Sequence, residues 1–92
     1  MPLSDDIDRK SLSAKTYEYC ESRGFDVDAD SYGATVFFED EEGNRVALDI
    51  DFDEDTVIVE WGEPEQDREE WSRKEFSGEN GDTLDKVKRY VL

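Results

Sequence analysis

The stretch DIDFDEDTVIVE, residues 49–60, carries Asp at its first, third and fifth positions and Glu at its twelfth. These are ligand positions of an EF-hand calcium loop. Such a loop also needs Gly at its sixth position for a sharp bend and a helix on each side, yet Glu54 occupies that position and both flanks alternate with period two. A strand, a turn and a second strand explain more of these residues than a calcium loop does. We therefore predict no metal site here.

Few other residues of this chain suggest catalysis. The chain has no His, the commonest general base and metal ligand. Its one cysteine, Cys20, has no His to activate it and is expected in the core. A lone cysteine excludes an intramolecular disulfide, and no segment resembles a signal peptide or a membrane span, which indicates a cytoplasmic protein. We expect neither an enzyme nor a cofactor.

The elements that position the acidic residues follow from hydrophobic periodicity. Leu12, Tyr19 and Cys20 form one stripe of a helix that Gly24 ends, with an alternative earlier start near Asp5 or Asp6. Residues 25–30, 34–40, 45–53 and 56–61 alternate with period two or are rich in β-branched and aromatic residues, as strands are. In residues 63–76, Pro64 and the glutamates after it could begin a helix, but a loop followed by a fifth strand over about 69–76 is the preferred interpretation. A last helix follows, capped by Asp82 or Thr83, with its apolar stripe at Leu84, Val87 and Val91.

This order predicts a single α+β domain over residues 1–92. It consists of an N-terminal helix, a four- to five-stranded antiparallel sheet and a C-terminal helix. Because polar residues occupy alternate strand positions, both helices are expected to pack on one face of the sheet and to leave the other exposed.

The negative charge is concentrated in the strands and their turns. The chain has 27 acidic and 11 basic residues, a net charge of −16. Sixteen of the acidic residues lie between Asp26 and Asp67, where Arg45 is the one basic residue; eleven acidic and ten basic residues lie elsewhere. Alternate residues of a strand stand ~6.7 Å apart on one face. Asp49, Asp51 and Asp53 are therefore expected to form a line of carboxylates, and the triplet Asp26, Asp28 and Asp30 a second one.

Regular rows of negative charge resemble the phosphate backbone that a nucleic-acid-binding groove receives. In size, charge and order of elements the chain resembles small acidic inhibitors that mimic DNA, such as anti-CRISPR proteins and uracil-DNA glycosylase inhibitors. An acidic immunity protein or antitoxin that blocks a basic nuclease has the same character. The resemblance implies a non-enzymatic inhibitor or regulator that binds a basic protein, such as a nucleic-acid-binding protein or a nuclease. Direct binding to nucleic acid or to membranes is not expected. Because like charges would meet if two acidic faces came together, we expect a monomer. The predicted partner-binding residues are Asp26, Asp28, Asp30, Asp49, Asp51, Asp53, Glu54, Asp55 and Glu60.

An alternative explanation is adaptation to a salt-rich cytoplasm, in which acidic residues keep the protein soluble and bind nothing in particular. Such adaptation is expected to spread over every exposed surface. The concentration of charge in the strand region favours a binding surface, but the sequence leaves both explanations open.

Overall fold

The computed structural model describes residues 8–91, which form two helices and five strands. The N-terminal helix α1 is Leu12–Ser22 and the C-terminal helix α2 is Leu84–Val91. The strands are β1 (Asp26–Ala29), β2 (Gly33–Glu39), β3 (Arg45–Asp51), β4 (Thr56–Gly62) and β5 (Ser72–Ser77), and a short 3-10 helix, η1 (Arg68–Glu70), precedes β5. All five strands pair antiparallel with their neighbours along the chain, in the order β1-β2-β3-β4-β5.

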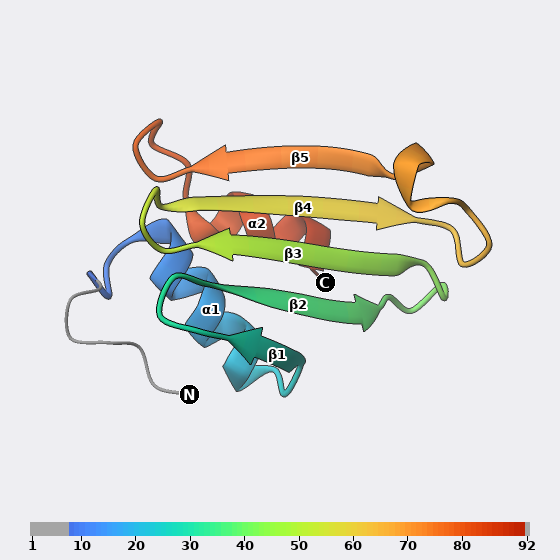
Figure 1. Cartoon of the computed structure of the whole chain (residues 1–92), viewed down its shortest axis with the longest axis horizontal. Coiled ribbons are helices and arrows are strands. Elements are labelled where there is room, and N and C mark those ends of the chain that lie inside the picture. Colours follow the sequence, from blue (N-terminus) through green and yellow to red (C-terminus); the bar gives the residue numbers. More distant parts are fainter. Residues whose placement is uncertain (1–7, 92) are drawn as a thin grey trace.

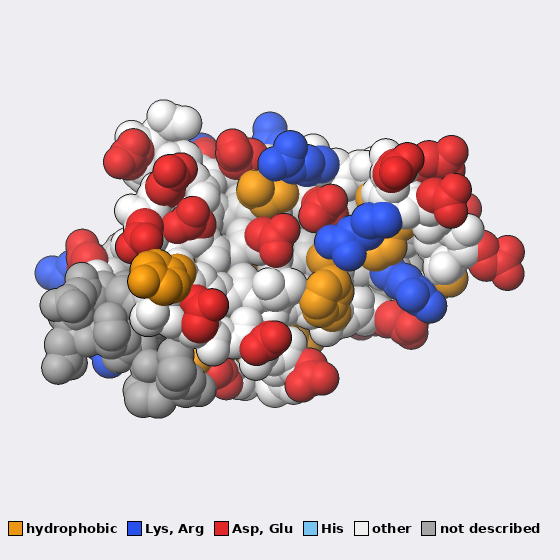
Figure 2. All heavy atoms as spheres, viewed as in Figure 1, with side chains coloured by type: hydrophobic (Ala, Val, Ile, Leu, Met, Phe, Trp, Pro, Cys, Tyr) orange, Lys and Arg blue, Asp and Glu red, His pale blue; other side chains and the backbone are white. Residues whose placement is uncertain are grey.

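The molecule has two layers, a sheet and a pair of helices (Figure 1). In that view both helices lie behind the strands, α1 behind the β1–β2 side and α2 behind β3 and β4. The opposite side of the sheet, which we call the open face, is turned toward the viewer, and Figure 2 shows its side chains from the same direction. No helix in the described part of the chain is long and apolar enough to cross a membrane.

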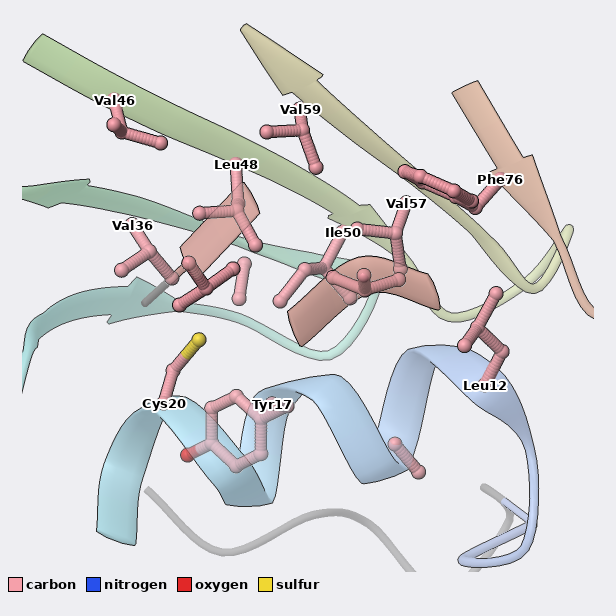
Figure 3. Close-up of a cluster of buried hydrophobic side chains, with 14 residues drawn as sticks. Leu12, Tyr17, Cys20, Val36, Val46, Leu48, Ile50, Val57, Val59 and Phe76 are labelled. Atoms are coloured by element: carbon pink, nitrogen blue, oxygen red, sulfur yellow. The ribbon is translucent and has the colours of Figure 1, made fainter. Parts of the chain in front are cut away.

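The core lies between the sheet and the helices. Period two sends Val46, Leu48 and Ile50 of β3 to the same side, and all three are buried. Cys20 of α1 points toward this apolar surface (Figure 3), and Tyr17 of α1 with Val87 and Val91 of α2 belong to the same buried cluster. Burial in this layer is what fixes the register of the strands, because a slip of one residue would turn the apolar side chains toward water.

The predicted α+β class, with an antiparallel sheet between two helices in sequence order, is confirmed, and the sheet has five strands. Helix α1 begins after the N-cap Ser11, whose hydroxyl accepts a hydrogen bond from Ala14 N, and Gly24 follows its end with φ of +76°. The alternative start near Asp5 or Asp6 lies outside the described residues. Within the predicted stripe Cys20 is buried, but Tyr17, which the stripe did not include, is more deeply buried than Tyr19.

Candidate partner-binding site

The register of the sheet defines rows of side chains on the open face, because residues that oppose each other across strands share a face. One row runs across all five strands through Asp28, Thr35, Asp49, Ile58 and Glu75. The next row toward the β3–β4 turn contains Gly33, Asp51, Thr56 and Ser77. Neither row contains a basic residue. We call this part of the open face, together with the adjoining turn residues Asp30 and Asp53, the acidic half.

The acidic half surrounds a shallow hollow of about 500 Å³. Five of the predicted site residues line it: Asp28, Asp30, Asp49, Asp51 and Asp53. In Figure 2 carboxylates spread over the left part of the sheet with no Lys or Arg between them, whereas toward the right Lys, Arg and hydrophobic side chains are interspersed with the acidic ones. The sequence placed the two aspartate triplets on separate strands, and the register brings Asp28 and Asp49 into one row, two strands apart.

The third member of each predicted triplet lies in a turn and not in a strand. β1 ends at Ala29 and β3 ends at Asp51, so Asp30 and Asp53 are the first or second residue beyond a strand. The Asp30 carboxylate accepts hydrogen bonds from Tyr32 N (2.8 Å) and Gly33 N (2.9 Å). The Asp51 carboxylate likewise accepts from Asp53 N (2.9 Å) and Glu54 N (3.1 Å). These two aspartates therefore stabilise turns while they face the hollow.

Asp28, Asp49 and Asp53 have no such structural task. All three are exposed, and none of their carboxylates forms a hydrogen bond or an ion pair within residues 8–91. An exposed carboxylate without an internal partner is available to a cation from outside. These three side chains, which line the hollow or its edge, carry negative charge that the fold itself does not use.

Asp55 faces away from the hollow and holds the fold together. Its Oδ1 accepts a hydrogen bond from Ser13 N (2.7 Å), one of the N–H groups that the first turn of α1 leaves without a helical partner. Its carbonyl oxygen accepts from Gly78 N (3.0 Å), in the turn between β5 and α2. Glu54, beside it, is exposed at the tip of the β3–β4 turn and does not line the hollow. We therefore assign Asp55 to the fold.

In the other half of the open face, which we call the balanced half, the strand rows carry equal numbers of acidic and basic residues once Arg68 is counted with them. Asp26 and Glu60 belong to the row of Phe37, Ala47 and Arg73, and Glu39 opposes Arg45 in the row beyond it. The Glu60 carboxylate forms an ion pair with Arg68 (3.2 Å), a residue of η1 that extends over this half. Glu60, a predicted site residue, is thus compensated within the molecule. In these rows, counted together with Arg68, three acidic residues (Asp26, Glu39 and Glu60) accompany three basic ones (Arg45, Arg68 and Arg73). The segment that precedes β5 adds further acidic residues (Glu63, Glu65, Asp67, Glu69 and Glu70).

Sequence reasoning missed several residues of the open face. Glu75 joins the row of Asp28 and Asp49, but its strand was the least regular part of the chain. Tyr32, 69% exposed, lies at the rim of the hollow. Phe37, 53% exposed, is grouped with Arg68 and Trp71, whose side chains come from a loop region more than thirty residues away. The alternation in β2 carried a signal for Phe37, because it places this ring on the polar side of the strand.

In the described part of the chain, no three Asp, Glu or Cys side chains are arranged so that they can hold a metal ion. The carboxylates around the hollow are spread along the strands and the turns, and they suit several separate cations of a partner better than a single ion. Cys20 is fully buried under the sheet, where burial raises the pKa of its thiol to about 11. Neither a thiolate nor a His is therefore available beside the acidic half.

Comparison with known proteins adds nothing to this geometry: no protein-family model, curated protein or solved structure matches the chain.

Proposed function

We propose that this protein is a non-enzymatic inhibitor or regulator that binds a basic partner protein through the acidic half of its open face. It acts as a monomer in the cytoplasm and occupies the surface with which the partner, a nucleic-acid-binding protein or a nuclease, would bind nucleic acid. One observation carries the proposal. The exposed carboxylates of Asp28, Asp49 and Asp53 converge on one hollow, without an internal cation among the described residues.

The charge on the rest of the molecule supports this interpretation. Helix α2 carries Asp85 with three basic residues (Lys86, Lys88 and Arg89), and α1 carries two acidic residues (Glu18 and Glu21) and one basic residue (Lys15), with Arg23 at its C-cap. A protein that uses acidic residues only for solubility has no reason to leave its helical surface balanced while it concentrates carboxylates on one part of a sheet.

Binding by such a surface begins with long-range attraction. A field of one sign steers a basic partner toward the acidic half and raises the association rate, and the effect weakens as salt screens the charges over a Debye length of about 8 Å at physiological ionic strength. Close contact then places Lys or Arg side chains of the partner between the rows.

The test is competition with nucleic acid. The immobilised protein is exposed to a lysate of its own organism at low salt and washed, and the bound protein is then eluted with short duplex DNA. We expect a basic protein that DNA displaces, because DNA and the acidic half would occupy the same surface. A captured protein that stays bound in excess DNA but leaves in salt would contradict nucleic-acid mimicry, and capture of no basic protein would contradict the proposal as a whole.

A further inference from the structure

The balanced half of the open face contains an aromatic groove that the charge of the chain does not explain. The groove has a volume of about 600 Å³, and its walls include Phe37, Pro64 and Trp71, with Arg45 and Arg68 at its rim. Large exposed apolar side chains are unremarkable one at a time. Here an exposed Phe37 ring, an indole and a proline are grouped around one concave surface, which is the arrangement of a binding pocket.

The fold fixes the groove from below. The Trp71 indole lies where a side chain on Gly62 would be, because a Cβ atom at that position would overlap the ring. The indole Nε1 donates a hydrogen bond to Gln66 O (3.3 Å). The Arg68 guanidinium lies 4.7 Å from the Trp71 ring centroid and 5.7 Å from that of Phe37, and it is also held by Glu60. A groove built from such contacts is preorganised, so a ligand loses little free energy in ordering it.

The charge at the rim indicates the kind of ligand. The charged residues that line the groove are two arginines and one glutamate, Glu39, so the arginines outnumber the carboxylate. Arg45 forms no ion pair within residues 8–91, and Arg68 forms one, with Glu60. A carboxylate is the group that arginine binds best, through parallel N–H donors. The apolar walls favour an aromatic or large aliphatic side chain. The groove thus fits an apolar side chain with an acidic residue next to it.

The groove adjoins the acidic half on the same face. Along β3, Asp49 and Arg45 are four residues apart, roughly 13 Å at ~3.3 Å per residue. We infer that the aromatic groove is the second contact of the same basic partner, and that it takes an aromatic residue flanked by a carboxylate while the acidic half binds the partner's Lys and Arg. This inference rests on the proposed function.

The acidic half and the aromatic groove are expected to affect different rates of binding. Exposed charges increase the association rate but are screened by salt, whereas buried aromatic and arginine contacts slow dissociation and resist salt. Trp and Arg are also the residues that most often dominate the energy of an interface. The groove therefore gives the complex a lifetime that the acidic half alone would not provide.

Two synthetic peptides test the inference by NMR on the ¹⁵N-labelled full chain. The basic peptide is acetyl-KSKSK-amide, and the extended peptide is acetyl-KSKSKGGGFE-amide, in which the three glycines separate the last Lys from Phe by about 13 Å when the chain is extended. At about 0.02 M NaCl both should shift the amide signals of Asp28, Thr35 and Asp49. Only the extended peptide should shift the Trp71 indole signal, bind at least about fivefold more tightly and keep that shift at about 0.5 M NaCl.

Matched variants separate the two contacts. Phe37→Ser should remove the advantage of the extended peptide, whereas Lys15→Ser, an exposed substitution on α1 that lines neither the hollow nor the groove, should preserve it. If the acidic half responds to both peptides but Trp71 responds to neither, the groove inference is wrong and the proposed function stands. If the acidic half responds to neither peptide, the proposed function is contradicted. Trp71 shifts that grow with protein concentration in the absence of peptide would assign the groove to a second copy of the chain and overturn the inference.

Discussion

At the scale of single residues, the aspartates of this protein have two kinds of task. Asp30, Asp40 and Asp51 accept backbone N–H groups and stabilise the turns that follow strands, and Asp55 does the same for the first turn of α1. Asp28, Asp49 and Asp53 contact no described donor. The alternation of aspartates in the sequence predicted that they share one face of the sheet. It did not predict which of them bind backbone N–H groups and which remain free for a partner, because that depends on which N–H groups lie nearby in the folded chain.

The structural task of Asp55 predicts a large effect of its removal. Asp55→Ala deletes the acceptor for Ser13 N and places alanine at φ of 55°, so we expect the free energy of unfolding to fall by about 1–2 kcal/mol. Asp55→Asn keeps an acceptor oxygen and tolerates this φ, and it should cost less than half as much. Urea unfolding measures both, with Asp53→Asn as a control that stays within about 0.5 kcal/mol of the wild type. An Asp55→Ala variant as stable as that control would show that the bond to Ser13 does not matter.

The raised pKa of the Cys20 thiol predicts that the free energy of unfolding falls at alkaline pH. Burial first, then the nearby Glu21 charge, raise the pKa of its thiol from 9.0 to about 11, while Arg23 acts in the opposite direction. Below pH 9 the thiol is protonated in both states, so its contribution is fully present. Between pH 9 and 11 the unfolded chain ionises first, and stability should fall by up to about 1.4 kcal/mol per pH unit.

The measurement compares urea unfolding of the wild type with that of Cys20→Ala between pH 8 and 11. The variant is expected to be less stable at pH 8, because it leaves a small cavity, but its stability should fall less steeply with pH. Parallel pH profiles of the two proteins would mean that Cys20 does not titrate differently in the folded state.

At the scale of elements, period two predicted β1 to β4 within one or two residues, because each strand buries alternate residues against the helices. β5 was expected from residue 69 and begins at Ser72, after the short helix η1. Trp71 fits no period because its ring lies over Gly62, a residue of the neighbouring strand. Contacts of this kind depend on tertiary structure, and the aromatic groove was therefore not predictable from the sequence. The acidic half was predictable, since it needs only alternation and strand order.

Two turns at the same end of the sheet should prove to be energetically coupled. A Cβ atom on Gly78, in the turn between β5 and α2, would overlap Oδ2 of Asp55, whose other oxygen binds Ser13 N. Gly78→Ala should therefore destabilise the wild type by about 1–3 kcal/mol. In an Asp55→Ala background the same substitution should cost much less, with a coupling energy of at least about 0.5 kcal/mol in a double-mutant cycle. Additive effects would show that the two turns do not compete for this space.

At the scale of the whole molecule, the distribution of charge separates a binding surface from salt adaptation. Self-repulsion among the carboxylates should make stability rise with salt in either case. A binding protein of an ordinary cytoplasm should nevertheless be fully folded at about 0.1 M NaCl, with a cooperative urea transition followed by circular dichroism. A chain that folds only near molar salt belongs to the salt-adapted alternative, and its acidic half would then need no partner.

The central claim is that a patterned acidic half, and not total charge, binds the partner. Its most direct test compares two triple variants that each remove three exposed negative charges: Asp28, Asp49 and Asp53 to Asn, and Glu69, Glu70 and Glu79 to Gln. Affinity for the DNA-displaceable partner is measured at about 0.1 M NaCl. With about 0.5 kcal/mol for each exposed charge, the first variant should bind about tenfold more weakly, mainly through slower association, and the second should stay within about threefold of the wild type. Equal losses in both variants, or no loss in the first, would contradict the account.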